Sequence, residues 1–198
     1  YRWHYQQVHH DIWDYDSPSP VVLFDADGRK GIAQASKTGW IYLLDRETGE
    51  PLLPIPETPV PQDATQKTAK TQPIPSYDPF IDHSITDADV AEIEKIAKAS
   101  AKGGAVPKVI KGRGIYTPFG KDITVIVPGP QGGTNWQPVS YNPKTGMFYV
   151  CGMRAVTGLS RSGSELPPGK QGQVADIGSV FSTTGFGAQR GFFAAFEA

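Results

Sequence analysis

The chain has 198 residues, and its 19 Lys and Arg residues nearly balance its 20 Asp and Glu residues. This balance argues against a nucleic acid or an anionic membrane surface as the main partner. The single cysteine, Cys151, excludes an internal disulfide, and no apolar run approaches the roughly 20 residues of a membrane span. The 22 glycines and 18 prolines favour many turns between short strands over long helices.

The opening stretch WHYQQVHHDIWDYDSP, Trp3 to Pro18, gathers aromatic, histidine and aspartate side chains. If it is a strand, side-chain alternation places Asp14 and Asp16 on one face, where their carboxylates can converge on one hard cation. The same alternation points the adjacent His9 and His10 to opposite faces, which makes them poor joint ligands. The alternative is that Asp14 or Asp16 ends a strand and caps the turn that follows, since aspartate is common in turns.

Four further stretches combine short aromatic and β-branched runs with polar turns, a pattern that predicts β-hairpins. The first is Val21–Ser36, with its turn at Asp25–Gly28. The others are Gly39–Pro54, Val139–Met153 and Arg190–Ala198, and the last of these stops where such a turn would begin. Their recurrence suggests a repeating β architecture.

The middle of the chain differs, because residues 51–79 are rich in proline and show no period. We expect an extended excursion that runs along a surface. A helix is predicted from Asp87 to Ala101, with Thr86 as its N-cap, Asp89 three residues on and a glycine soon after its end. Three apolar residues should face the β body from the periphery: Val90, Ile93 and Ala97. The plain structural interpretation is a surface helix that covers a loop.

Two short stretches allow both a structural and a chemical interpretation. Lys37 stands in Ser-Lys-Thr-Gly-Trp, and a lysine before Thr-Gly is usually a solvated turn residue. In GGTNWQP, Gly132 to Pro138, two glycines let the backbone approach a neighbour closely, and Asn135 and Trp136 then offer an amide and a flat apolar ring. The alternative for this stretch is a strand-entry turn with a core tryptophan, and spacing alone leaves both open.

Three motifs in this order, WHYQQVHHDIWDYD, ASKTGWIYLLDRETGE and GGTNWQPVSYNPKTGMFYV, resemble the quinoprotein dehydrogenases that use pyrroloquinoline quinone (PQQ). HHDIWDYD followed by PVPQ and TQPIP is similar to the glucose dehydrogenases, and GGTNWQPVSYNPKTG looks more like the alcohol dehydrogenases. The resemblance implies an all-β fold, an eight-bladed β-propeller of four-stranded antiparallel sheets. At roughly 40 to 60 residues a blade, we expect residues 1–198 to be a C-terminal-half segment that cannot close the ring. We expect an insertion at about 55–115 that holds the Pro-rich loop and the helix 87–101.

The resemblance also implies roles for individual residues. Asp14 matches the catalytic base, which would also contact the metal, and Lys37 matches the basic residue that hydrogen-bonds the quinone oxygens. Asn135 and Trp136 match the segment that contacts the far side of the cofactor. Asp16 matches a position that is an added metal ligand in lanthanide-using alcohol dehydrogenases. Glucose-type members also carry aspartate there, so both Ca²⁺ and a lanthanide stay open.

On this resemblance, the opening stretch is a strand that delivers Asp14 into a cofactor cavity. Trp13 and Tyr15 are expected to pack behind that strand. Asp14, Lys37 and Asn135 are expected to lie around one cavity although they are far apart in the sequence.

The implied function is oxidation of an alcohol, polyol or sugar hydroxyl by hydride transfer to PQQ, with a bound cation as Lewis acid. The implied partners are the small-molecule substrate, an electron acceptor such as cytochrome c or ubiquinone, and the remaining propeller blades. The implied location is the periplasm, although no signal peptide is recognised within this chain. The alternative is a non-catalytic propeller scaffold built from the same repeats. Such scaffolds lack the Asp, Lys and Asn-Trp set, so the motifs favour the enzyme.

Overall fold

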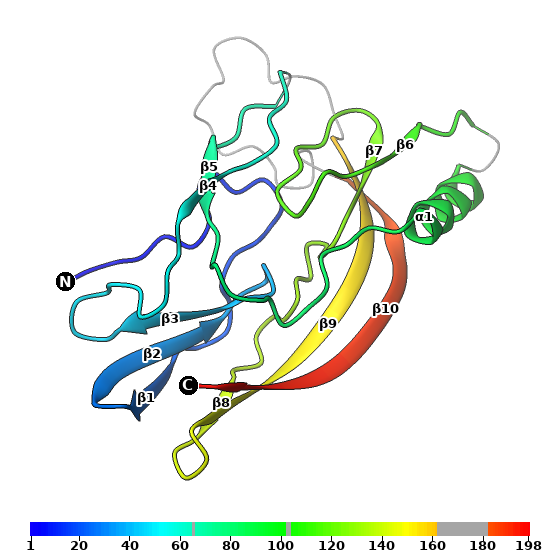
Figure 1. The fold of residues 1–198 in the computed structure, drawn as a ribbon. Coiled ribbons are helices and arrows are strands. Elements are labelled where there is room, and N and C mark those ends of the chain that lie inside the picture. Colours follow the sequence, from blue (N-terminus) through cyan, green and yellow to red (C-terminus); the bar gives the residue numbers. More distant parts are fainter. Residues whose placement is uncertain (65, 102–103, 162–181) are drawn as a thin grey trace.

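The computed structural model describes residues 1–198 apart from 65, 102–103 and 162–181 (Figure 1). The strands in this part are β1 (Val22–Ala26), β2 (Arg29–Ala35), β3 (Ile41–Asp45), β4 (Glu57–Pro59), β5 (Thr71–Pro73), β6 (Val109–Lys111), β7 (Ile123–Ile126), β8 (Ser140–Asn142), β9 (Met147–Ser160) and β10 (Ser182–Glu197). The helix α1 covers Asp87–Ser100. No helix within the described ranges has both the length and the apolar character that a membrane crossing needs.

The first sheet is antiparallel, with strand order β1-β2-β3. The predicted hairpin over Val21–Ser36 is confirmed, and its turn residues Asp27 and Gly28 have φ values of 50° and 74°. Positive φ at both central residues suits the twist of two-residue hairpins. The predicted hairpin over Gly39–Pro54 is only half formed, because the arm that returns from β3 makes a single bridge, between Leu44 and Pro51. Proline lacks the N–H that a longer ladder needs.

The second sheet has the order β10-β9-β7-β6, and β8 also pairs with β9. Strand β9 is 14 residues long, and it pairs with β8 near its start and with β7 near its end. This confirms the predicted hairpin over Val139–Met153, with Gly146 at a φ of 67°. Within the stretch Arg190–Ala198, residues 190–197 form the end of β10, which follows β9 along its curved length (Figure 1).

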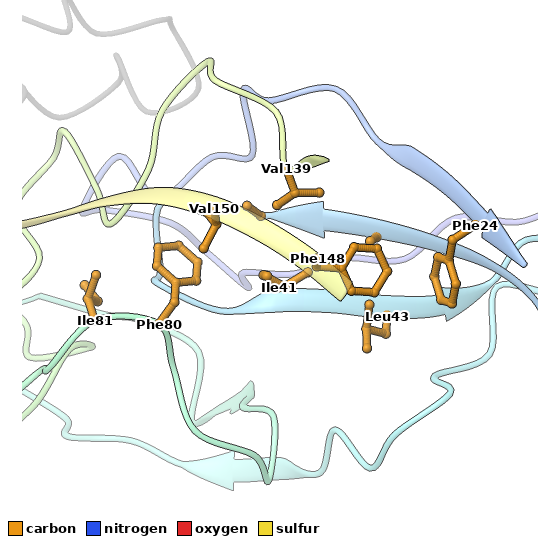
Figure 2. Packing of buried hydrophobic residues seen from close by; sticks show 10 residues of the cluster. Phe24, Ile41, Leu43, Phe80, Ile81, Val139, Phe148 and Val150 are labelled. Carbon is orange, nitrogen blue, oxygen red and sulfur yellow. The ribbon is translucent and has the colours of Figure 1, made fainter. Parts of the chain in front are cut away.

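Apolar side chains from both sheets meet in one core, which Figure 2 shows from close by. Phe148 and Val150 of β9 pack with Ile41 and Leu43 of β3, and Phe24 of β1 meets the ring of Phe148 edge-on at 4.9 Å. Phe80 and Ile81, from the loop before α1, complete this core. Burying these side chains joins the sheets through the hydrophobic effect. The loop that carries Phe80 is thereby fixed between them.

Helix α1 forms where the sequence predicts it and ends one residue earlier. Thr86 and Asp89 form the predicted capping box, and Ala101 is the C-cap in a right-handed conformation. Ile93 and Ala97 are buried against the second sheet, and Val90 is half-buried, so the predicted face is confirmed. Because this face rests on β7 and β9, the helix covers a sheet and not a loop.

Candidate functional site

The segment that contains Asp14 is a turn, so the predicted strand is wrong. The structure has no strand in residues 1–20, and Asp14 has a φ of 67°. The Asp11 carboxylate accepts hydrogen bonds from the Trp13 and Tyr15 N–H groups, at 2.8 and 2.7 Å. An aspartate that bonds the backbone two residues on is the usual way for this side chain to reverse a chain. Asp11, and not Asp14 or Asp16, therefore caps the turn, and alternation along a strand does not apply.

Two aromatic residues anchor this turn from behind, as the sequence predicts. Trp13 and Tyr15 are fully buried, with ring centroids 5.9 Å apart. The Trp13 indole Nε1–H donates to the Thr117 carbonyl at 2.7 Å, and the Tyr15 hydroxyl donates to the Pro128 carbonyl at 2.6 Å. Burial raises the pKa of Tyr15 well above its usual value, so the hydroxyl keeps its proton at neutral pH. The turn is thus pinned to distant backbone at both rings.

Asp14, Asp16 and Lys37 come together at the open side of the turn. The Lys37 Nζ lies 2.9 Å from Asp14 Oδ2 and 2.6 Å from Asp16 Oδ1. The lysine side chain is 6 % exposed, whereas the two aspartate side chains are 52 % and 54 % exposed. Lys37 is therefore a buried cation that pairs with two half-exposed carboxylates, and it is not a solvated turn residue.

Lys37 keeps its charge in this setting. Burial by itself lowers the pKa of a lysine, but the hydrogen bonds to Asp16 and Asp14 and the charges of both carboxylates outweigh it and raise the pKa of Lys37. The ammonium is consequently present throughout the neutral range. The three groups form one charged cluster with two acidic members and one basic member.

The Gly132–Gly133 backbone lies directly against Lys37. The Gly133 N–H donates to the Lys37 carbonyl at 2.7 Å. A Cβ added at Gly132, which has a φ of 78°, would lie 2.4 Å from the Lys37 Cβ. The sequence predicts that these glycines allow a close approach, and the structure identifies the neighbour as the Lys37 turn.

Asn135 and Trp136 follow these glycines and line a hollow whose lining includes neither Asp14 nor Lys37. Its volume is about 430 Å³, and its lining also includes Gln131, Cys151 and Met153. The Asn135 Nδ2 donates to the Gln131 carbonyl at 3.2 Å, and Trp136 is 69 % exposed. The alternative of a core tryptophan is therefore wrong. The backbone links this hollow to the Lys37 turn, but the Asn135 side chain points to its own loop.

Of the two adjacent histidines, His9 helps to hold the segment in place. His9 Nε2 lies 2.9 Å from Glu57 Oε1, and His10 is exposed. The buried Gln72 of β5 accepts from the His9 N–H and donates to the His9 carbonyl, both at 2.7 Å. The ribbon β4–β5, inside the predicted insertion, thus holds the chain that leads into the Asp14 turn. Nothing in the sequence singles out Gln72, whereas the Asp11 spacing is a recognisable turn signal.

The cluster can be tested for its fit to a hard cation. Carboxylate oxygens are the ligands of Ca²⁺ and related hard cations, and Asp14 and Asp16 offer half-exposed ones. Among the described residues no group of three or more His, Cys, Asp or Glu side chains is placed to hold a metal ion. Since such cations take about six to eight oxygens, these two carboxylates fit a shared site whose other ligands come from outside the cluster. Lys37 fits a different need, a hydrogen-bond donor for a quinone oxygen.

Comparisons with known proteins agree with the motifs. Residues 1–191 match the model of the PQQ family described as glucose/ethanol/alcohol dehydrogenase, beta-propeller domain. A probable quinate dehydrogenase (quinone) of Xanthomonas campestris pv. juglandis is 32% identical over 161 residues, which are 77% of this chain and 20% of that protein. Quinoprotein glucose dehydrogenase A of Acinetobacter calcoaceticus is 32% identical over 153 residues, or 71% of this chain and 19% of that protein.

Among solved structures, the chain is similar to a quinohemoprotein alcohol dehydrogenase from Comamonas testosteroni. It is 28% identical, with a TM-score of 0.45 over 82% of this chain and 19% of that chain. The chain spans about one fifth of the length of the relatives that it matches.

Proposed function

The chain belongs to the family of PQQ-dependent glucose, ethanol and alcohol dehydrogenase β-propellers, and we propose that it carries the catalytic base of such an enzyme. The proposed reaction is oxidation of an alcohol, polyol or sugar hydroxyl by hydride transfer to PQQ. The observation that supports it best is the cluster of Asp14, Asp16 and Lys37, which brings three of the five family-matching residues together. The alternative, a non-catalytic scaffold built from the same repeats, is expected to lack this set of Asp and Lys residues.

Each member of the cluster has a proposed task. When bound, PQQ supplies a two-electron acceptor, and a hard cation, Ca²⁺ or a lanthanide, supplies a Lewis acid. Asp14 takes the substrate hydroxyl proton on a carboxylate oxygen, which its half-exposed position allows. Lys37 holds Asp14 in place and donates a hydrogen bond to the quinone oxygen, and Asp16 adds an oxygen ligand toward the cation.

The remaining assignments follow from the family and the fold. Asn135 and Trp136 are proposed to contact the far side of the cofactor, and the exposed indole of Trp136 is free to do so. Trp13 and Tyr15 are fully buried behind the turn and anchor it to the core. The proposed partners are the remaining propeller blades and an electron acceptor, cytochrome c or ubiquinone, in the periplasm.

The test is the substitution Asp14→Asn in the complete enzyme that contains this chain. Asparagine keeps the size and an oxygen for the cation but cannot accept the hydroxyl proton. We expect dye-linked dehydrogenase activity to fall by about two to four orders of magnitude, while PQQ titration still shows binding.

Asp25→Asn is the matched control, because Asp25 is exposed in the β1–β2 hairpin and pairs with Arg46. Its activity should equal that of the wild type. Activity of Asp14→Asn within a factor of a few of wild type would show that Asp14 is only a turn residue. Lack of any PQQ-dependent turnover in the wild type would favour the scaffold.

A further inference from the structure

His83 lies beneath the turn that carries Lys37, in the loop just before α1. Its Nε2 is 2.8 Å from the Thr38 carbonyl oxygen, and its ring meets Trp40 edge-on with centroids 4.6 Å apart. Because a carbonyl oxygen can only accept, His83 Nε2 must carry the hydrogen of this bond. The side chain is therefore fixed at both its polar atom and its ring.

Three successive carbonyls of the Lys37 turn are each bonded by a different group. Lys37 accepts from the Gly133 N–H at 2.7 Å, Thr38 accepts from His83, and Gly39 accepts from the Phe80 N–H at 2.8 Å. Two of the three donors belong to residues 80–83. The other two donors are backbone N–H groups, whereas His83 donates from its side chain, so only its bond can be removed by a substitution.

The loop and the turn also pack without a gap. Gly39 has a φ of 90°, and a Cβ added there would lie 2.5 Å from Ile81 Cγ1 and 2.9 Å from His83 Nε2. Any shift of the His83 ring is thus transmitted to the backbone two residues from Lys37. Close-packed interiors transmit such shifts because they hold few voids.

The His83 imidazole acts as an uncharged donor. Burial lowers the pKa of His83 to about 4, although the bond to Thr38 and the nearby Asp82 carboxylate oppose the shift. At neutral pH the ring is consequently neutral. It holds the turn without adding a second positive charge to that of the Lys37 ammonium, which pairs with Asp14 and Asp16.

We propose that His83 is a positioning residue that fixes the Lys37 turn, and with it the place of the Lys37 ammonium between Asp14 and Asp16. The proposal rests on the proposed function, since Lys37 is the group that would meet the cofactor. Its effect on the reaction passes through the Thr38 carbonyl and the Lys37 backbone. A small misplacement of a catalytic group is enough to slow a reaction strongly.

The test compares His83→Phe, which keeps a ring against Trp40 but loses the donor, with His83→Gln, which keeps an N–H donor. Both are made in the complete enzyme and loaded with PQQ. Turnover is measured per bound PQQ, so a loss of folded protein does not count. We expect His83→Phe to fall by about 10- to 100-fold and His83→Gln to stay much nearer the wild type.

Ile93→Val is the matched control. Ile93 lies on α1 and is fully buried against the second sheet, so this change removes core contacts without touching the turn. It should lower the midpoint of thermal unfolding and leave turnover per bound PQQ unchanged. Equal turnover in His83→Phe and Ile93→Val would overturn the positioning role.

Hydrogen exchange of the Phe80 and Gly133 amides, which bond the turn, gives a readout that needs no turnover. In the wild type these amides should be protected like those of the strands. In His83→Phe both should exchange at least about 10-fold faster, since an opened hydrogen bond exposes its amide. Fast exchange already in the wild type overturns the proposal even if the variant does not fold.

The two proposals fail in different ways. If the wild type shows no PQQ-dependent turnover yet the exchange pattern is as expected, the proposed function fails. The conclusion that His83 fixes the Lys37 turn then still holds. If the wild type turns over and His83→Phe matches it per bound PQQ, only the role of His83 is refuted.

Discussion

Helix α1 begins at a capping box whose two members, Thr86 and Asp89, are three residues apart. The turn from Asp11 to Asp16 is bent locally by the Asp11 carboxylate, but its two rings are anchored by partners 104 and 113 positions away, the carbonyls that accept from Trp13 and Tyr15. The helix could begin to form from its own sequence, whereas the turn needs the rest of the fold. Chemistry is proposed at the second kind of region, where the side chains of Asp14 and Lys37 depend on many distant contacts.

The comparison teaches where a substitution should do most harm. A residue that acts through local contacts, such as a helix cap, contributes one interaction, and its loss weakens one cap or one turn of helix. A residue held by distant contacts takes part in the core, and its loss opens a cavity and frees the backbone. The following changes test this difference, from the largest expected effect to the smallest.

Trp13→Ala should lower the free energy of unfolding by about 3–5 kcal/mol, because a fully buried indole is lost together with its bond to Thr117. Denaturant unfolding of the cofactor-free protein measures it. Trp136→Ala is the matched control, since Trp136 is 69 % exposed, and it should stay within about 0.5 kcal/mol of the wild type. Similar losses for both would mean that the Asp11–Asp16 turn does not depend on its anchor.

Lys37→Met should lower kcat/KM by about 10²–10³-fold, as the loss of one preorganised donor does elsewhere. Methionine keeps much of the volume, but Asp14 and Asp16 lose the ammonium that they share. Steady-state assay of the complete, PQQ-loaded enzyme measures the change. Lys30→Met removes a surface lysine that pairs with Glu47 at 3.0 Å, and it should leave kcat/KM unaltered. An active Lys37→Met enzyme would remove Lys37 from the proposed mechanism.

Asp89 ties α1 to the sheet, and this tie should depend on pH. Burial by itself raises the pKa of Asp89, but the hydrogen bonds from Arg154 and Thr86 outweigh it and lower the pKa to about 2. Because the folded pKa lies below the unfolded value of about 3.9, the contribution is complete above that value. It is lost as pH falls through about 2.

We therefore expect the free energy of unfolding to drop by on the order of 2 kcal/mol from this group between about pH 4 and pH 2. Unfolding curves at several pH values measure the drop, which Asp89→Asn should lack. Asp87→Asn, in the same helical turn but with a 98 % exposed side chain, should retain it. A drop that persists in Asp89→Asn would assign the acid sensitivity to another carboxylate.

Thr86→Ala should cost about 1 kcal/mol of unfolding free energy, the usual value for an N-cap. The hydroxyl accepts from the Asp89 N–H at 3.1 Å and is the local signal that starts α1. Ser100→Ala, at the other end of the helix, is the control and should change little. A loss of several kcal/mol in Thr86→Ala would show that the two regions depend on the fold to the same degree.

Some features follow from short stretches of sequence and were predicted from them. The β1–β2 hairpin follows from Asp27 and Gly28, which accept positive φ, and α1 follows from its cap and its apolar period. The close approach at Gly132 follows from glycine itself. In each case the deciding interaction joins residues within a few positions, or needs only the absence of a side chain.

Other features were settled only by tertiary contacts. Asp14 adopts a φ of 67° although its surroundings read as a strand, because Asp11 bends the chain and the core takes up the rings on either side. Lys37 is buried because Gly133 and His83 hold its turn from two sides. Apart from the local bend at Asp11, no short pattern encodes these contacts, since they pair residues that are dozens of positions apart and become favourable only when the sheets have packed.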